Sequence, residues 1–432
     1  MAEAKVLSFV PHLKPVGELD SDPSMADSEW HDAYGKRTIS RSHVQLSGKS
    51  RAINEVCVER VGEEVEDNVV MLHGYGAGLG LFYRNLEPIS RVPGVKLFAL
   101  DLLGMGNSSR PPFKMISKTK EDKVIEAENW FIDALEEWRA VRKIERFTLV
   151  GHSLGGYLAV SYAVKYPGHL KKLILASPVG VPENPYAVDA SMPEPTESTV
   201  QNEVIVDQID VTKNDTADQV KNQKTADTTN PTDAPKRTMP GWFVWLWDAN
   251  ISPFSLVRNA GPLGPRFMSG WSSRRFNHLP TREATVLHEY AFSIFKQKGS
   301  GEYALSHILA PGAYARRPIL NRIHEVGRQT VKKPDGTEGQ ENGIPIVFMY
   351  GDSDWMDVAG GKAAEEKLHQ HREKVLENGT EAERRSEKGS SRLIVVPKAG
   401  HNIFLDNPPS FNQFITEELM KTKQMEKDTS KA

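Results

Sequence analysis

Apolar and polar positions alternate along much of the chain with two different periods. Residues 35–61 alternate at every second position, as the two strands of a hairpin do, and residues 68–104 contain two apolar strand-like runs around a glycine-rich loop. From Asp122 to Lys143 apolar residues recur at helical spacing, and a further apolar run covers residues 172–177. This succession of strands and helices predicts an α/β fold with a mostly parallel sheet covered by helices on both faces.

The regular pattern stops after Ser177 and resumes near residue 344. Residues 183–238 contain 11 acidic and 5 basic residues and hardly any aromatic ones, which predicts a disordered acidic linker. Residues 239–343 are basic instead, and we interpret them as a helical cap inserted between two core strands. The predicted units are an N-terminal segment (1–34), a first core part (35–182), the linker (183–238), the cap (239–343), a second core part (344–420) and a loose tail (421–432).

A glycine-rich turn at residues 151–156 has the sequence Gly-His-Ser-Leu-Gly-Gly. It follows the strand-like run 146–150 and precedes a helical run of small residues. A serine on a sharp turn from strand to helix is a nucleophile elbow, which holds the hydroxyl out over the edge of the sheet. Gly151 and Gly155 suit this turn because it strains the serine backbone and brings strand and helix close together. We therefore predict that Ser153 is a nucleophile.

Two backbone amides are candidates for stabilising an oxyanion beside Ser153. The amide of Leu154 stands at the N-terminus of the predicted helix, where N–H groups face an anion. The second comes from residues 73–78, a loop in which small residues such as Gly74 let the backbone come close. We assign this second amide to Tyr75.

Two later strand-like runs end near candidate partners for the serine. One ends at a turn that contains Asp354, and the other ends shortly before His401. A serine hydroxyl becomes a strong nucleophile when a neutral imidazole takes its proton, and a buried carboxylate holds that imidazole in one tautomer. The order Ser153, Asp354, His401 is the chain order of the α/β-hydrolase triad.

Other residues of the same types have alternative interpretations. Asp352 and Asp357 are close rivals of Asp354, because one residue of register decides which carboxylate points inward. We interpret His73 and His152, which lie inside the two glycine loops, as hydrogen-bonded residues that shape these turns.

Composition narrows the class of protein. A net charge of -3 over 432 residues argues against a partner that is a nucleic acid. The single cysteine, Cys57, excludes an internal disulfide and suits a reducing, intracellular compartment. No apolar run is long enough to span a bilayer, and the acidic N-terminal region is unlike a signal or transit peptide. The predicted chemistry requires no metal and no cofactor.

The predicted cap opens with three tryptophans, and several arginines follow them. Tryptophan is favoured at membrane interfaces and arginine binds anionic phosphate, so both together above a hydrolytic site favour a lipid-binding surface. The alternative is that the tryptophans form the small core of the cap. The candidate membrane-binding residues are Trp242, Trp245, Trp247, Arg258, Arg266, Arg274 and Arg275.

With these motifs the chain resembles the α/β-hydrolase-domain 4 and 5 group, which includes a fungal cardiolipin-specific deacylase and lysophosphatidic acid acyltransferase-like proteins. The cap segments discriminate this group, because hydrolases in general share only the loops. The resembling segments are residues 4–11, 73–78, 101–111, 151–156, 252–254, 261–264, 314–319 and 401–406.

The resemblance implies an enzyme that handles lipid esters, and three hypotheses follow. The first is a serine phospholipase or deacylase that remodels cardiolipin or related glycerophospholipids through an acyl-enzyme. The second is a lysophosphatidic acid acyltransferase that uses the same site. The third is a non-catalytic, lipase-activating lipid-binding protein, although relatives of that kind have lost the serine that this chain keeps at Ser153.

The resemblance also implies partners and a place of action. These are a phospholipid or lysophospholipid substrate, a peripheral contact with a membrane or lipid-droplet surface, and acyl-CoA as a second substrate. The family location is mitochondrial, with the cytoplasm or the lipid-droplet surface as alternatives. His401 and Asp406 form the His-x-x-x-x-Asp motif that is associated with acyl transfer in this family; the alternative for Asp406 is a cap of the helix that follows.

Overall fold

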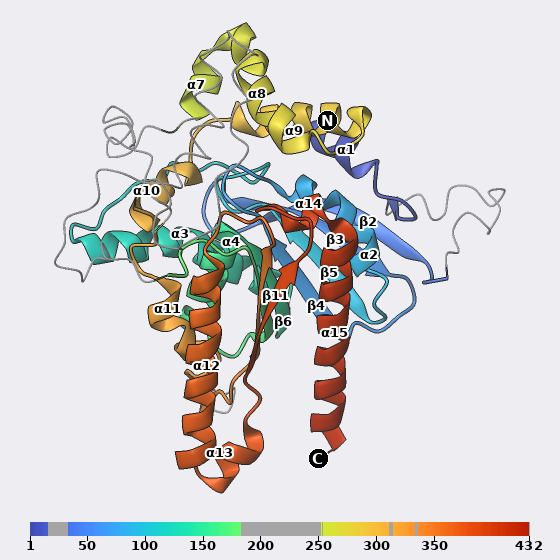
Figure 1. Ribbon diagram of the computed structural model, residues 1–432. Helices are drawn as coiled ribbons and strands as arrows, with labels where there is room; N and C mark the ends of the chain where they lie inside the picture. Colours follow the sequence, from blue (N-terminus) through green and yellow to red (C-terminus); the bar gives the residue numbers. More distant parts are fainter. Residues whose placement is uncertain (16–32, 183–251, 253, 311–313, 333–335, 432) are drawn as a thin grey trace, which may run out of the picture.

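A nine-stranded sheet forms the centre of the described part of the protein (Figure 1). The computed structural model describes residues 1–432 except 16–32, 183–251, 253, 311–313, 333–335 and 432. From edge to edge the strands are β1 (Lys14–Pro15), β2 (Arg37–Gln45), β3 (Ala52–Arg60), β5 (Val95–Leu100), β4 (Asp67–Leu72), β6 (Phe147–His152), β7 (Leu170–Ala176), β10 (Pro345–Gly351) and β11 (Ser390–Val396).

The sheet is mostly parallel, as predicted. Strands β2 and β3 form the expected antiparallel hairpin, and β3 is also antiparallel to β5. From β5 to β11 every neighbouring pair is parallel. The carboxyl ends of these strands therefore lie along one edge of the sheet, where the loops after β4, β6, β10 and β11 meet.

Strand β4 illustrates how the sheet separates two apolar cores. Val70 and Leu72 belong to one core, and Val69 and Met71 belong to the other. Successive side chains of a strand point to opposite faces, so a strand that is buried on both sides needs a continuous apolar run. None of these four side chains is more than 2% exposed, which explains the unbroken apolar sequence of β4.

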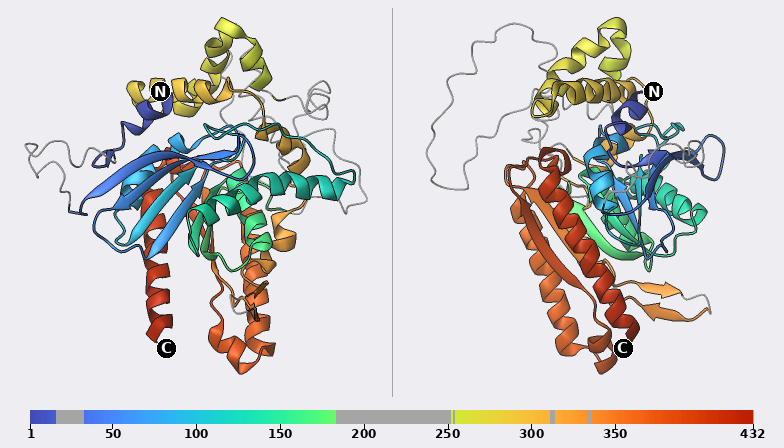
Figure 2. Two further views of the ribbon diagram at one scale, coloured as in Figure 1. Left: turned by 180° about the vertical axis from the view of Figure 1, so that it is seen from behind. Right: turned by 90° about the vertical axis from the view of Figure 1, so that its right-hand side faces the viewer.

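Helices cover both faces of the sheet, which confirms the predicted α/β-hydrolase architecture (Figure 2). Each of the two cores contains side chains of several helices. On one side these helices include α3 (Lys120–Val141), α4 (Leu154–Lys165) and α12 (Val358–Asn378). On the other side they include α2 (Tyr83–Ile89), α14 (Ile403–Asp406) and α15 (Pro408–Lys431). The short helix α13 (Glu381–Ser386) follows α12.

A helical insertion separates β7 from β10, as the sequence predicts. Helices α7 to α9 lie beyond the carboxyl ends of the strands, at the top of Figure 1. The helices are α7 (Phe254–Asn259), α8 (Gly264–Phe276), α9 (Thr281–Phe295), α10 (Leu305–Ile308) and α11 (Ile319–Arg322). The predicted linker at 183–238, and the three tryptophans of the cap, lie outside the described residues.

The last part of the predicted cap range is a small hairpin. Strands β8 (Thr330–Lys332) and β9 (Glu338–Gln340) pair antiparallel. The hairpin is anchored beside the loop before β7, because the amide of Gly168 donates to the carboxylate of Glu341 (2.8 Å). That loop lies at the opposite end of the sheet from the loops after β4 and β6, so the hairpin does not roof the site.

The C-terminal tail differs from the prediction of a loose segment. Helix α15 continues to Lys431, and its later turns pack on the core. Thr422 is 3% exposed, and the Lys423 ammonium donates to the carbonyl of Pro93 (2.6 Å). The charged sequence suggested a solvated tail, but one face of the helix carries the residues that make these contacts. No helix in the described ranges is long and apolar enough to cross a bilayer.

Candidate active site

Ser153 occupies the turn between β6 and α4 in a strained conformation. Its backbone has φ 53° and ψ -116°, in a region that a residue with a side chain rarely adopts. The two glycines of the turn are required by close packing. A Cβ on Gly151 would lie 2.5 Å from the carbonyl oxygen of Gly155, and a Cβ on Gly155 would lie 2.6 Å from the carbonyl oxygen of Leu72. This geometry is that of a nucleophile elbow.

The glycine loop, residues 73–79, runs beside the serine. A Cβ on Gly74 would lie 2.9 Å from the Cβ of Ser153, so only glycine lets the loop come this close. The next amide along the loop is that of Tyr75, and its role as an oxyanion donor stays a prediction. The amide of Leu154 is in the first turn of α4, where N–H groups have no partner within the helix.

His73 orients the glycine loop and does not act as a base. Its Nε2 accepts from the amide of Leu102 (3.1 Å), and its Nδ1–H donates to the carbonyl of Gly74 (2.7 Å). A trans peptide places its carbonyl and N–H on opposite sides, so this bond turns the amide of Tyr75 away from His73. Burial lowers the pKa of His73 to about 4, so the ring stays neutral near pH 7.

Asp354 and His401 form a hydrogen-bonded pair at the ends of β10 and β11. The Nδ1–H of His401 donates to Oδ1 of Asp354 (3.2 Å), whose side chain is fully buried. Burial on its own raises the pKa of this carboxyl, but the hydrogen bond and charge of His401 bring the pKa below its ordinary value. With Nδ1 protonated in the neutral ring, Nε2 of His401 is left as the basic atom.

The two rival aspartates have different partners. Asp352 accepts from the amides of Lys398 (2.8 Å) and Ala399 (3.1 Å), so it ties the end of β10 to the turn after β11. Asp357 caps helix α12 by accepting from the amide of Ala359 (2.8 Å). The structure thus brings Asp354, and neither of the other two, to the histidine.

His401 is enclosed by two further rings. The ring centroids of His152 and Trp355 lie 4.8 Å and 4.7 Å from that of His401. His152 donates through Nε2 to the backbone carbonyl of His401 (3.0 Å), and burial lowers the pKa of His152. His152 therefore shapes the site in its neutral form, as the sequence analysis predicts.

Asp406 holds the turn that carries His401. Its Oδ2 accepts from the amide of Gly400 (3.0 Å). The alternative that Asp406 caps helix α15 is wrong, because the cap is Asn407, which accepts from the amide of Ser410 (3.2 Å). The carboxylate of Asp406 is instead turned toward the backbone just before His401.

Helix α8 of the cap contacts the same turn. The guanidinium of Arg275 donates to Oδ1 of Asn402 (2.6 Å), the residue that follows His401. His278, just after α8, contacts the carbonyl of Leu405 (3.3 Å) through Nε2. The cap and the histidine turn are therefore joined by side-chain hydrogen bonds.

The cap arginines differ in their surroundings. Arg258 is paired with Glu302 (2.7 Å), and Arg275 lies over the ring of Trp271 (5.1 Å) as well as on the histidine turn. Both therefore have structural partners. Arg266 is exposed on α8, and Arg274 lies on the same helix.

Aromatic side chains, among them that of Tyr75 and three that the sequence analysis did not single out, form an apolar wall beside the glycine loop. Tyr75 stacks on Phe254 (ring centroids 5.3 Å apart), and Phe254 contacts Phe295 (4.4 Å). Trp271 adds to the cluster from α8. They lie on four separate segments, so only their apolar type, and no spacing, could have drawn attention to them.

The described residues offer neither a metal site nor a reactive thiol for catalysis. These contain no group of three His, Cys, Asp or Glu that could hold a metal ion. Cys57 is buried on β3, and burial raises the pKa of its thiol to about 12, so it stays protonated. Among the predicted catalytic side chains, the structure joins Asp354 to His401 by a hydrogen bond and places Ser153 on the strained turn after β6.

The chain belongs to the alpha/beta hydrolase fold family, whose model matches residues 67–408. It is 30% identical over 376 residues to a probable 1-acylglycerol-3-phosphate O-acyltransferase of Oryza sativa subsp. japonica, covering 85% of this chain and 70% of that protein. It is 28% identical to the (lyso)-N-acylphosphatidylethanolamine lipase of Homo sapiens, covering 84% and 83%. It is 26% identical to the 1-acylglycerol-3-phosphate O-acyltransferase ICT1 of Saccharomyces cerevisiae, covering 97% and 95%. The relatives are thus named for lipase and for acyltransferase activity.

Proposed function

We propose that the protein is a serine enzyme that cleaves acyl esters of glycerophospholipids through an acyl-enzyme. The observation that carries this proposal is the strained Ser153 together with the buried Asp354 hydrogen-bonded to His401. A structural serine does not need φ 53° at the end of a central strand, and the strain is a cost of about 1–3 kcal/mol that catalysis explains.

The first half of the proposed reaction forms the acyl-enzyme. The Oγ of Ser153 attacks the ester carbonyl carbon while Nε2 of His401 takes the hydroxyl proton. The amides of Tyr75 and Leu154 donate to the oxyanion, and Asp354 stabilises the imidazolium. The intermediate then breaks its bond to the alcohol oxygen, and His401 returns the proton to the departing lysophospholipid.

The second half decides between hydrolase and acyltransferase. If water attacks the acyl-enzyme, His401 takes its proton and a free fatty acid leaves. If the hydroxyl of a lysophospholipid attacks, a new phospholipid forms at the same serine, and acyl-CoA can load the serine by the same steps with the thiol as leaving group. Asp406 has no separate chemical role here, since it holds the turn of His401.

A non-catalytic lipase activator is the weaker candidate. A protein that acts only by binding has no use for a strained serine or for a histidine whose Nδ1 is held by a buried carboxylate. The names of the relatives, which include both a lipase and acyltransferases, also favour catalysis.

The proposed site of action is a membrane or lipid-droplet surface. The cap lies over the carboxyl ends of the strands (Figure 2), so a cap in contact with lipid brings the acyl esters to the serine. The exposed Arg266 on α8 is suited to an anionic headgroup. Cardiolipin as the substrate and mitochondria as the compartment stay predictions.

The test is an acyl-labelled phospholipid panel that includes cardiolipin and N-acylphosphatidylethanolamine. Purified protein is incubated with each lipid, with and without lysophosphatidic acid, and separately with labelled acyl-CoA and lysophosphatidic acid. We expect labelled fatty acid or labelled phosphatidic acid from the wild type and neither from Ser153→Ala. Equal product from both proteins would overturn the proposal.

A further inference from the structure

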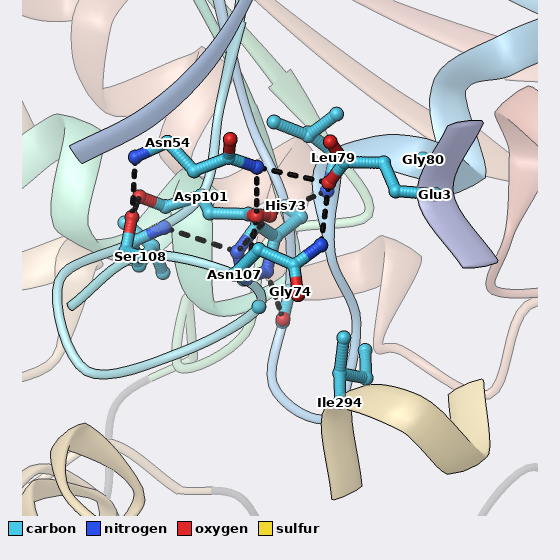
Figure 3. Close-up of polar contacts among 12 residues, drawn as sticks. Glu3, Asn54, His73, Gly74, Leu79, Gly80, Asp101, Asn107, Ser108 and Ile294 are labelled. Carbon is cyan, nitrogen blue, oxygen red and sulfur yellow. Dashed lines mark hydrogen bonds and ion pairs between the residues drawn. The ribbon is translucent and has the colours of Figure 1, made fainter. Parts of the chain in front are cut away.

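Asp101, just after β5, anchors the far end of the glycine loop (Figure 3). Its Oδ1 accepts from the amide of Leu79 (2.7 Å) and lies 3.5 Å from Nε2 of His73. Its Oδ2 accepts from the amide of Asn107 (2.7 Å), and the residue is fully buried. The carboxylate therefore anchors the end of the loop that follows Tyr75.

A second buried carboxylate, Glu3, joins this network from helix α1 (Ala2–Leu7) (Figure 3). Its Oε2 accepts from Nδ2 of Asn54 (2.9 Å) and from Nδ2 of Asn107 (2.7 Å). Nδ2 of Asn54 also donates to Asp101 (2.8 Å), so one amide group bridges the two carboxylates. Glu3 is 6% exposed although it is the third residue of the chain. The proposed reaction leaves this arrangement unexplained.

Helix α1 is seated between the core and helix α9 of the cap (Figure 2). Val6 is fully buried, and Arg282 of α9 lies over the ring of Phe9 (5.5 Å). Lys5 forms an exposed ion pair with Glu289 of α9 (2.7 Å). Contacts other than those of Glu3 therefore also hold the helix against the core and the cap.

The charges around Glu3 favour an uncharged acceptor at this position. Burial and the neighbouring Asp101 raise the pKa of Glu3, while Asn107, Asn54 and the partly exposed Arg41 at 3.9 Å lower it by less. Burial raises the pKa of Asp101, while the positive charge of Arg110 lowers it by less, and burial with the negative charge of Asp101 raises the pKa of Tyr290. Since both amides donate to the single atom Oε2, a glutamine can accept both through its one oxygen.

We propose that Glu3 is a positioning residue for the glycine loop, acting through Asn54, Asn107 and Asp101 on the amides beside the nucleophile. This inference rests on the proposed function for its effect on catalysis, and on the hydrogen bonds alone for its effect on the loop. Glu3 makes no contact with substrate in this account. Its removal loosens the loop and so weakens the oxyanion contact made by Tyr75.

The test compares Glu3→Ala, Glu3→Gln and the control Lys5→Ala in the full-length protein. Lys5→Ala removes an exposed ion pair from the same helix and leaves the network untouched. Hydrogen exchange of a peptide that covers residues 74–82 reports the Leu79 amide without requiring activity. Hydrolysis of a short nitrophenyl ester gives kcat and KM separately.

We expect Glu3→Ala to raise exchange of this peptide and to lower kcat about tenfold with KM within twofold, a fraction of the loss seen when an oxyanion donor is deleted. Glu3→Gln and Lys5→Ala should keep both readouts within twofold of the wild type. Unchanged exchange in Glu3→Ala, or equal loss in Glu3→Gln, would overturn the inference.

If Glu3→Ala does not fold, Asn107→Ala provides the same test. This variant loses the side-chain links to Glu3 and to Gln297 but keeps the backbone amide on Asp101. A wild type without ester hydrolysis would overturn the proposed function and leave the exchange test intact, so the two failures are distinguishable.

Discussion

Replacing Asp354 with asparagine removes one negative charge and leaves the shape of the side chain nearly unchanged. Oδ1 of Asp354 accepts from both the Nδ1–H of His401 (3.2 Å) and the amide of Met356 (3.0 Å). The asparagine can keep its oxygen on these donors or turn its NH₂ to the imidazole, which then takes the other tautomer. In either case the imidazolium that forms during the reaction loses its buried counter-charge.

The expected cost follows from this loss. In a Ser-His-Asp site the aspartate-to-asparagine change lowers kcat about 10⁴-fold, equivalent to about 5 kcal/mol of transition-state stabilisation. The carboxyl of Asp354 is fully buried and its pKa is below the ordinary value, so the full effect is expected above pH 5. KM should change little, because the side chain does not reach the substrate.

Two matched controls stand on the same turn. Asp352→Asn keeps one of the two backbone contacts, since its single oxygen can accept from only one of the two amides. Asp357→Asn keeps its cap on α12, because asparagine caps helices as well as aspartate does. The assay is nitrophenyl ester hydrolysis, with thermal unfolding as the check on folding. We expect both controls to keep kcat within about threefold. The assignment of Asp354 as the triad carboxylate would be refuted if Asp354→Asn kept more than a tenth of the wild-type activity. It would also be refuted if Asp357→Asn lost more activity than Asp354→Asn.

Three further predictions concern the loop, its histidine and the cap. Gly74→Ala places a methyl group 2.9 Å from Cβ of Ser153, which is too close, so the loop must shift. We expect kcat in the same assay to fall about 100-fold, with the fold intact by circular dichroism. An unchanged kcat would mean that the loop is not close to the nucleophile. Burial lowers the pKa of His73 to about 4, so the folded state loses about 3 kcal/mol of stability as the pH falls from 6.5 to 4 and the buried ring must be protonated. His73→Gln should therefore flatten this part of the curve of unfolding free energy against pH, measured by urea unfolding. An unchanged slope would contradict a buried, neutral His73. Replacing Trp242, Trp245 and Trp247 by alanine should weaken sedimentation of the protein with anionic and with neutral liposomes. Arg266→Glu should weaken sedimentation with anionic liposomes only, and more so at low salt. Unchanged binding in both variants would show that these residues do not bind the lipid surface.

The parts of the site that the sequence predicts are local. The elbow at Ser153 follows from a glycine pattern over six residues, and the order of strands, serine and histidine can be followed along the chain. The choice among Asp352, Asp354 and Asp357 was open because it depends on how one turn is wound after β10. The structure decides it through contacts with β11 and α12, which spacing along the chain does not show.

The remaining features depend on contacts between distant segments. Glu3 is separated along the chain from Asn54 by 51 positions and from Asn107 by 104, and Arg275 is separated from Asn402 by 127. A lone glutamate near a chain end looks like any solvated residue, so its burial becomes visible only in the fold. The same holds for the tail at 421–432, where charge suggested a loose segment and packing of α15 gives a helix.

The central claim, that Ser153 is a nucleophile activated by His401, is tested most directly by covalent labelling. A fluorophosphonate should form a phosphorus–oxygen bond with Oγ of Ser153 and release fluoride, while His401 takes the hydroxyl proton. Peptide mass spectrometry should then find the adduct on Ser153 in the wild type and in Asp352→Asn. The adduct should be lost in His401→Ala, with thermal unfolding unchanged. An unlabelled Ser153 in active enzyme, or equal labelling of Ser153 in wild type and His401→Ala, would contradict the account.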